Sequence, residues 1–190
     1  MYQVNSFALF AQGQYDGFYP YSSILKKGDF GIGTFNALNG EMVLLDGKVF
    51  RIEAAGTPIQ VDGTETAPVA TYCKFNEDLS FEASGLSLEE LKTEIDSRLP
   101  DKDLFYAIRI EGEYNRIITR SIYAQEKPYK PLPEVIKEEV RLESQNLQGT
   151  AVGFRAPEHM EQALWNSYHL HFISTDETVG GHIHEADLGK

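Results

Sequence analysis

Two glycine-containing pairs divide the region from residue 28 to residue 52 into short apolar segments, and they restrict the fold more than any other feature. Asn39-Gly40 and Asp46-Gly47 separate segments rich in Phe, Ile, Val and Leu. Such pairs favour tight turns with positive φ, which connect antiparallel strands. The region is therefore expected to form an antiparallel meander. Its expected strands are residues 28–35, 41–45 and 48–52.

Strand patterns continue along the chain, and helical patterns are few. The clearest helix begins at Ser87, because Glu90 completes a capping box and apolar residues follow at helical spacing up to Leu99, before Pro100. No regular alternation of strand and helix appears, so the expected class is α+β, with mixed or antiparallel β-sheets and few helices. Further strands are expected at 68–75, 104–110, 114–122, 149–154 and 168–173, a serine-capped helical turn at 21–27, short helices at 134–142 and 157–165, and either a helix or a strand within 2–12.

A proline-rich segment, residues 127–133, is the best candidate for a boundary. Three prolines in seven residues remove ladder hydrogen-bond donors, so an extended connector is expected there. It would separate an N-terminal β-rich half, 1–126, from a C-terminal half, 127–190, that carries the histidine-rich strand. The halves are expected to pack closely, or to form one continuous domain.

Composition excludes several classes of protein. The formal net charge of −12 and the lack of a basic patch argue against nucleic-acid binding. No apolar run approaches the roughly 18 residues that span a bilayer, and residues 1–4 lack the basic start of a secretory signal. The single cysteine, Cys73, excludes an intramolecular disulfide and fits a reducing compartment. Its place in the strand pattern of 70–75 favours a small residue on a half-buried strand over a nucleophile. A cytoplasmic protein without membrane association is expected.

Three of the five histidines lie within fourteen positions, from His169 to His182. On a strand, His169 and His171 would point to the same face, and Gly180-Gly181 would let a following turn bring His182 beside them. Three imidazoles are a common protein contribution to a catalytic zinc, which keeps one coordination position open. Imidazole also suits copper, iron and nickel, so the ligand type leaves the ion open.

Other arrangements of the histidines are less favoured. His184 would lie on the same strand face as His182. It would be either a further ligand or, as the favoured alternative, a solvent-facing neighbour. His159 lies in a charged segment that is typical of an exposed helix. A cupin site also begins with His-x-His. However, Glu177 follows His171 by six residues, whereas the cupin pattern prefers four or five, and His182 comes too soon for its second motif.

Several separated blocks along the chain form a recognisable series. The blocks are GDFGIGT (28–34), NGEM (39–42), FYAI (105–108), KPY (127–129), GTAVGF (149–154), YHLHFI (168–173) and GGH (180–182). Gly112, Arg120 and Pro157 lie between them. In residue types and in order, over residues 2–182, this series resembles the α-acetolactate decarboxylase family.

The resemblance implies roles for individual residues. His169, His171 and His182 would bind Zn²⁺, and Glu41 would be the acidic residue at the metal. Arg120 would meet the substrate, and Thr34 would be the active-site threonine. The implied enzyme is a carboxy-lyase, a cytoplasmic homodimer that converts (S)-2-acetolactate to (R)-acetoin and carbon dioxide.

The chemistry is consistent with these residue types. Acetolactate has a hydroxyl and a ketone on adjacent carbons, and loss of carbon dioxide leaves an enediolate that a Lewis acid stabilises. Arg120 offers a planar fork for a carboxylate or an enediolate oxygen, and Glu41 can shuttle the proton that ends on carbon.

Two other functions stay open at this point: a degenerate relative that only binds a metal or small ligand, and a zinc lyase of a related β-keto acid. Family members commonly continue beyond the third histidine with a strand and an acidic residue that reaches the site. In a naturally short protein, His184 or Glu185 would be the candidate for that place.

Overall fold

The structure, a computed structural model, describes residues 1–163 and 167–189. Twelve strands and a few short helices are found in this part of the chain. The strands are β1 (Tyr2–Val4), β2 (Tyr19–Pro20), β3 (Phe30–Thr34), β4 (Glu41–Leu45), β5 (Lys48–Ile52), β6 (Pro58–Val61), β7 (Thr66–Ala67), β8 (Ala70–Cys73), β9 (Tyr106–Ser121), β10 (Val140–Arg155), β11 (Tyr168–Ser174) and β12 (Gly180–Leu188). The helices are α1 (Phe7–Ala11), α2 (Tyr21–Ile24), α3 (Leu88–Arg98) and α4 (Leu132–Val135), with 3-10 helices η1 (Asn36–Leu38), η2 (Ile136–Glu138) and η3 (Glu158–Ala163).

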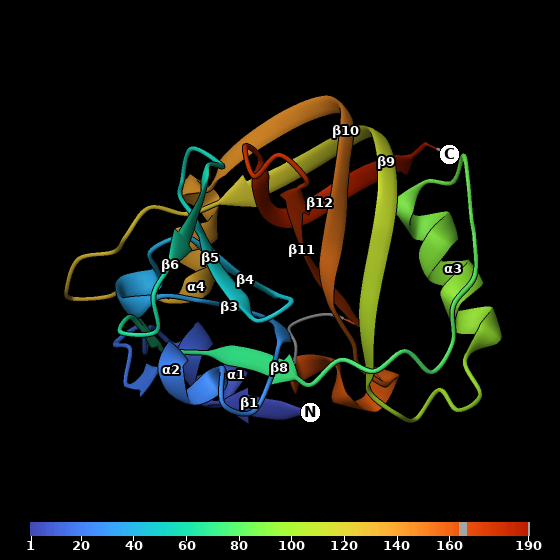
Figure 1. Ribbon diagram of the computed structural model, residues 1–190. Helices are drawn as coiled ribbons and strands as arrows, with labels where there is room; N and C mark the ends of the chain where they lie inside the picture. The colour runs from blue at the N-terminus through green and yellow to red at the C-terminus, as the bar shows by residue number, and fades with distance from the viewer. Residues whose placement is uncertain (164–166, 190) are drawn as a thin grey trace.

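Two β-structures make up most of the fold. One is a six-stranded antiparallel sheet in the order β1-β8-β3-β4-β5-β6, and the other is a closed barrel in the order β10-β11-β12-β9. Figure 1 shows the long strands β9 and β10 beside α3, with the six-stranded sheet on the other side of the molecule. Antiparallel sheets with few helices confirm the α+β prediction. The boundary proposed between 126 and 127 stays a prediction; the barrel takes β9 from before it and the other three strands from after it.

The expected meander is present. Asp46 and Gly47 have φ values of 51° and 76°, and they connect β4 directly to β5 as a two-residue turn. The connection from β3 to β4 covers residues 35–40, close to the 36–40 expected, and contains η1; Thr34 pairs with Glu41 across the ladder.

The barrel strands β9 and β10 are longer than the sequence predicts. The two strands expected at 104–110 and 114–122 are one strand, because β9 continues through Glu111-Gly112-Glu113 and is 16 residues long, with Gly112 opposite Gly149 of β10. Likewise, β10 begins at Val140, where a charged helix was expected, and the strand predicted at 149–154 is only its second half. Cross-strand pairing over the whole length of both strands outweighs these local signals.

Three helical predictions also need correction. Helix α2 begins after Pro20, and no serine side chain caps it. The helix predicted over 134–142 is reduced to α4 and η2. The segment expected to be an extended connector, 127–133, begins with a bend at residues 127–128 and ends inside α4, which starts at Leu132. The helix expected over 157–165 is the 3-10 helix η3, and residues 164–165 of that prediction lie outside the described residues.

Helix α3 forms as the sequence predicts. The Ser87 side chain accepts a hydrogen bond from the Glu90 backbone N–H, and the Glu90 carboxylate accepts one from the Ser87 N–H, which completes the capping box. The helix buries Leu88, Leu91 and Ile95 in the same core cluster as β9, β11 and β12. It therefore covers one side of the barrel.

Replacing Ser87 with alanine is expected to lower the free energy of unfolding by about 1 kcal/mol, because the backbone donor of Glu90 loses its partner. Urea unfolding followed by circular dichroism measures the effect. Ser80→Ala serves as the control, since the Ser80 hydroxyl donates only to the exposed Glu77. Equal unfolding midpoints for both variants would contradict this role of the cap.

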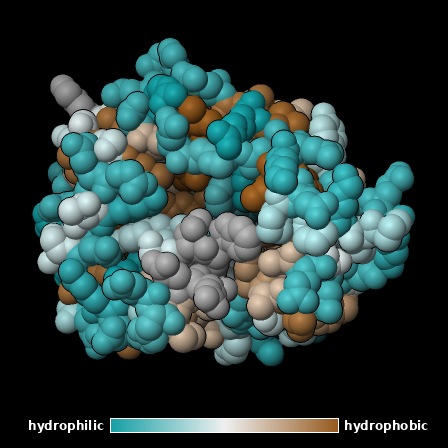
Figure 2. Space-filling model, turned by 180° about the vertical axis from the view of Figure 1, so that it is seen from behind, coloured by the Kyte–Doolittle hydropathy of each residue, from teal (hydrophilic) through white to brown (hydrophobic). Residues whose placement is uncertain are grey.

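A shared core joins the sheet to the barrel. Ile32, Val43 and Phe50 of the sheet pack with Val152 and Phe154 of β10. Seen from behind, most of the surface is hydrophilic and hydrophobic residues form only small groups (Figure 2). None of the helices in the described ranges is long and apolar enough to cross a bilayer. The packing fixes β4 against β11 and β12, where the histidines lie.

Candidate metal centre

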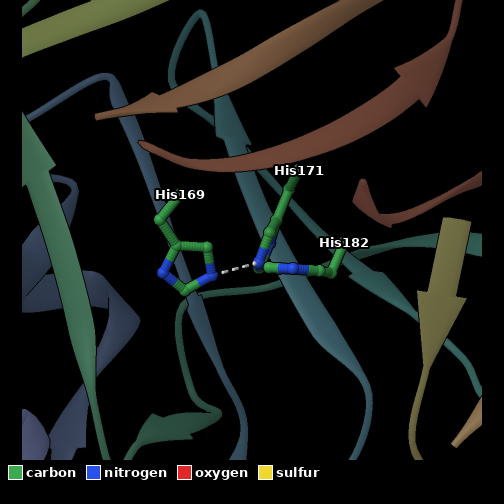
Figure 3. Close-up of side chains that lie close together, drawn as sticks. All are labelled: His169, His171 and His182. Carbon is green, nitrogen blue, oxygen red and sulfur yellow. Dashed lines mark hydrogen bonds between the residues drawn. The ribbon is translucent and has the colours of Figure 1, made fainter. Parts of the chain in front are cut away.

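Strand geometry brings the three histidines together. His169 and His171 are two residues apart on β11, and His182 of β12 lies directly opposite His171 in the ladder. Their rings lie near one another in Figure 3, and one nitrogen atom of each lies within 4.8 Å of the others. The structure therefore brings together the three residues that the spacing singled out as metal ligands.

His171 has a defined tautomer. Its Nδ1 lies 2.8 Å from the Met42 carbonyl oxygen of β4, which can only accept a hydrogen bond, so Nδ1 carries the proton. The ring is 1 % exposed, and this burial lowers the pKa of His171 to about 3. The neutral ring therefore presents the lone pair of Nε2 toward the other histidines, as a metal ligand must.

The other two rings fit the same role. The Nε2 atoms of His169 and His171 are 3.1 Å apart (Figure 3). The Nδ1 atom of His182 is buried without a hydrogen-bond partner among the described residues, and burial lowers the pKa of His182 well below its usual range. Buried polar atoms without a partner are costly. A cation bound between the rings would satisfy these nitrogen atoms together, so the residues present fit a metal ion.

Glu41 and Arg120 lie beside the triad. The Glu41 carboxylate, at the start of β4, has one oxygen 3.4 Å from the Nε2 atom of His171 and the other 2.6 Å from Nη1 of Arg120. Arg120 is on β9, directly opposite His182. Burial raises the pKa of Glu41, while the charge of Arg120 opposes that shift. A carboxylate facing an unprotonated imidazole nitrogen again favours a cation between them.

Thr34 supports the chain just before Glu41 and is 2 % exposed. Its hydroxyl donates a hydrogen bond of 2.5 Å to the Gly40 carbonyl, and its own carbonyl accepts one from the Tyr21 hydroxyl. The hydrogen bond from its side chain therefore joins the two ends of the loop between β3 and β4. Its role as an active-site threonine stays a prediction.

Replacing Thr34 with valine is expected to lower the free energy of unfolding by about 1–3 kcal/mol, because the buried Gly40 carbonyl loses a donor. Thr34→Ser keeps the hydroxyl and should be affected less. Urea unfolding of both variants measures the difference. A valine variant as stable as the wild type would show that the hydrogen bond does not support this loop.

The remaining sequence candidates do not belong to the triad. His184 is half-buried and its ring is 5.7 Å from that of His182, but its Nε2 pairs with Glu139 at 3.0 Å, outside the histidine group. Glu185 is exposed and pairs with Arg116. His159 is exposed, as expected.

The sequence reading missed Glu139, which lies just before β10. Its side chain is 8 % exposed and lines a cavity of about 270 Å³ next to the triad. It falls within the short charged helix predicted over 134–142, and no local signal marks it as a site residue. The cavity is lined by Phe7, Lys92, Arg120, Leu132, Ile136, Glu139, Arg141, Tyr168, His169, His182, Ile183 and His184.

Known proteins resemble this chain over its whole length. Residues 1–190 match the family described as alpha-acetolactate decarboxylase. The chain is 39 % identical to the alpha-acetolactate decarboxylase of Methanosarcina mazei, covering 100 % of this chain and 66 % of that protein. It is also 39 % identical to the alpha-acetolactate decarboxylase of Bacillus subtilis strain 168, covering 96 % and 72 %. The chain therefore spans about two thirds of the length of these relatives.

Solved structures agree with the sequence matches. The crystal structure of alpha-acetolactate decarboxylase from Bacillus subtilis strain 168 superposes with a TM-score of 0.95 at 38 % identity, covering 99 % of this chain and 81 % of that one. A Staphylococcus aureus protein of unknown function, described as similar to alpha-acetolactate decarboxylase, gives 0.96 at 26 % identity over the same shares. The chain belongs to the alpha-acetolactate decarboxylase family, a family of carboxy-lyases.

Proposed function

We propose that the protein decarboxylates (S)-2-acetolactate to (R)-acetoin and carbon dioxide, with zinc held by His169, His171 and His182. The observation that carries the proposal is the convergence of three imidazoles beside the paired side chains of Glu41 and Arg120. Family membership supports the substrate. The donor set of three nitrogens and a nearby carboxylate suits zinc.

The reaction breaks the bond between the carboxylate carbon and C2 of acetolactate. The electron pair remains on the substrate as an enediolate, and a proton added to C2 completes acetoin. A bound zinc ion would supply Lewis acidity toward the negative charge that develops on oxygen.

Arg120 binds and orients the substrate in this proposal. Its guanidinium lines the cavity, and Nη1 is held by Glu41. A planar guanidinium matches a carboxylate in the ground state, or an oxygen whose charge grows during the reaction. Arg120 therefore fixes which face of the substrate lies toward the histidines.

Glu41 moves the proton. Its carboxylate contacts His171 and Arg120, and the residue is 6 % exposed, so bulk water has little access to it. A proton delivered from one fixed carboxyl group reaches one face of the enediolate. This gives a single configuration at C2, which we propose to be (R).

The test combines metal analysis with product analysis. Protein stripped with a chelator should form no acetoin, and zinc should restore activity with one ion per chain. Chromatography on a chiral column should then show mainly (R)-acetoin. Bound zinc without acetoin would favour a degenerate metal-binding relative, and faster turnover of another β-keto acid would replace the proposed substrate.

We also propose that the protein is a homodimer in the cytoplasm. The family resemblance supports the dimer, and the single cysteine, Cys73, fits a reducing compartment. Light scattering with size-exclusion chromatography measures the mass in solution. A monomer at micromolar concentration would remove the dimer from this proposal.

A further inference from the structure

We infer that Glu139 is a positioning residue that holds the Arg120 guanidinium at the cavity. The expected effect on kcat/KM rests on the proposed function. The expected effect on the position of the Arg120 side chain rests only on its contacts. Glu139 lies at the end of η2, where its backbone N–H donates to the Ile136 carbonyl. Its side chain is 8 % exposed and lines the cavity.

The Glu139 carboxylate is at the centre of a cluster of basic groups. One oxygen lies 3.2 Å from Nε of Arg120, and the other lies 2.6 Å from Nε of Arg141 and 3.0 Å from Nε2 of His184. A carboxylate buried to this extent is stable only when it is paired. Here every partner belongs to a strand of the barrel.

The ladder explains why a carboxylate is needed at this place. Arg120 of β9 lies directly opposite Arg141 of β10, and its other neighbour across the ladder is His182. Like charges opposite each other in adjacent strands repel. Glu139 contacts both guanidinium groups and offsets that repulsion. Without its charge, Arg120 would be pushed away from Arg141 and toward the histidines.

Two carboxylates therefore hold Arg120 from two sides. Glu41 pairs with Nη1, and Glu139 pairs with the opposite edge at Nε. Nη2 makes no hydrogen bond to the residues that the structure describes, so this donor is available to a ligand in the cavity. A guanidinium held at two atoms loses little freedom when it binds a substrate.

The experiment compares Glu139→Gln, which keeps the shape and removes the charge, with Glu139→Asp, which keeps the charge. Glu138→Gln is the matched control, because Glu138 is 73 % exposed and pairs only with the exposed Lys130. We expect Glu139→Gln to lower kcat/KM for acetolactate about tenfold at unchanged zinc content. Glu139→Asp should recover part of the loss, and the control should match the wild type.

A measurement that does not depend on enzymatic activity separates this inference from the proposed function. Crystal structures of the zinc-loaded variants should show the Arg120 side chain rotated or in two conformers in Glu139→Gln, and in its wild-type position in Glu138→Gln. An unmoved Arg120 in Glu139→Gln would overturn the inference, as would unchanged kcat/KM in an active enzyme. A wild type that makes no acetoin would overturn the proposed function, while the crystal structures would still decide the role of Glu139.

Discussion

Replacing Arg120 with alanine is expected to lower kcat/KM for acetolactate by about a hundredfold to a thousandfold, while zinc stays bound. The Arg120 side chain is 13 % exposed, pairs with the carboxylates of Glu41 and Glu139, and lines the cavity. Its removal takes away the donor that we propose to bind the substrate, and no histidine is lost. Steady-state kinetics and metal analysis on the same preparation measure both effects.

The same change is also expected to destabilise the fold. Glu41 and Glu139 would each lose an ion pair in a buried setting, which costs about 3–5 kcal/mol when one partner of a buried pair is removed. Arg120→Lys keeps a charge but not the planar fork, and should lie between alanine and wild type in both measurements. Arg98→Ala is the control, since its guanidinium pairs with Glu94 on the exposed side of α3. Loss of zinc from Arg120→Ala would show that the role proposed for Arg120 is wrong.

The second large effect is expected at His169. Replacing it with alanine should weaken zinc binding by more than about 100-fold, beyond the 10–100-fold typical of residues that only support a ligand. His169 is a better site than His171 for this substitution. His171 is buried and also hydrogen-bonds to the Met42 carbonyl, so its removal would disturb the fold as well as the metal site. Competition with a chelating dye measures the affinity, and acetoin formation should fall with zinc content.

The control for this prediction is His159→Ala. His159 is exposed and lies outside the triad, so its removal tests whether any histidine on the surface contributes to zinc binding. We expect wild-type affinity for this variant. Unchanged affinity in His169→Ala would contradict the assignment of the triad.

Features that depend on neighbouring residues could be predicted from the sequence. The capping box of α3 and the Asp46-Gly47 turn are complete within a few positions, so their residue types determine their structures. The approach of His169, His171 and His182 was also accessible, because it needs only the two-residue period of a strand and one hairpin.

Features that depend on distant pairing could not be predicted. Glu111-Gly112-Glu113 has the composition of a turn, and only its ladder to β10 makes it the middle of a strand. Glu41 and Arg120 were identified through family resemblance alone, since no local pattern places them 2.6 Å apart. Glu139 was missed for the same reason: its partners on β9 and β12 become visible only when the barrel closes.

The hydrogen bond from His171 to the Met42 carbonyl has a consequence for folding. Carbonyl groups along a strand point alternately to its two sides, so a shift of β4 by one residue would turn this acceptor away from the imidazole. Without this acceptor, the His171 ring could take its other tautomer, with the proton on Nε2. The Nε2 lone pair would then no longer be available to bind a cation. Metal binding would then favour the correct alignment of a strand that contributes none of the three histidines.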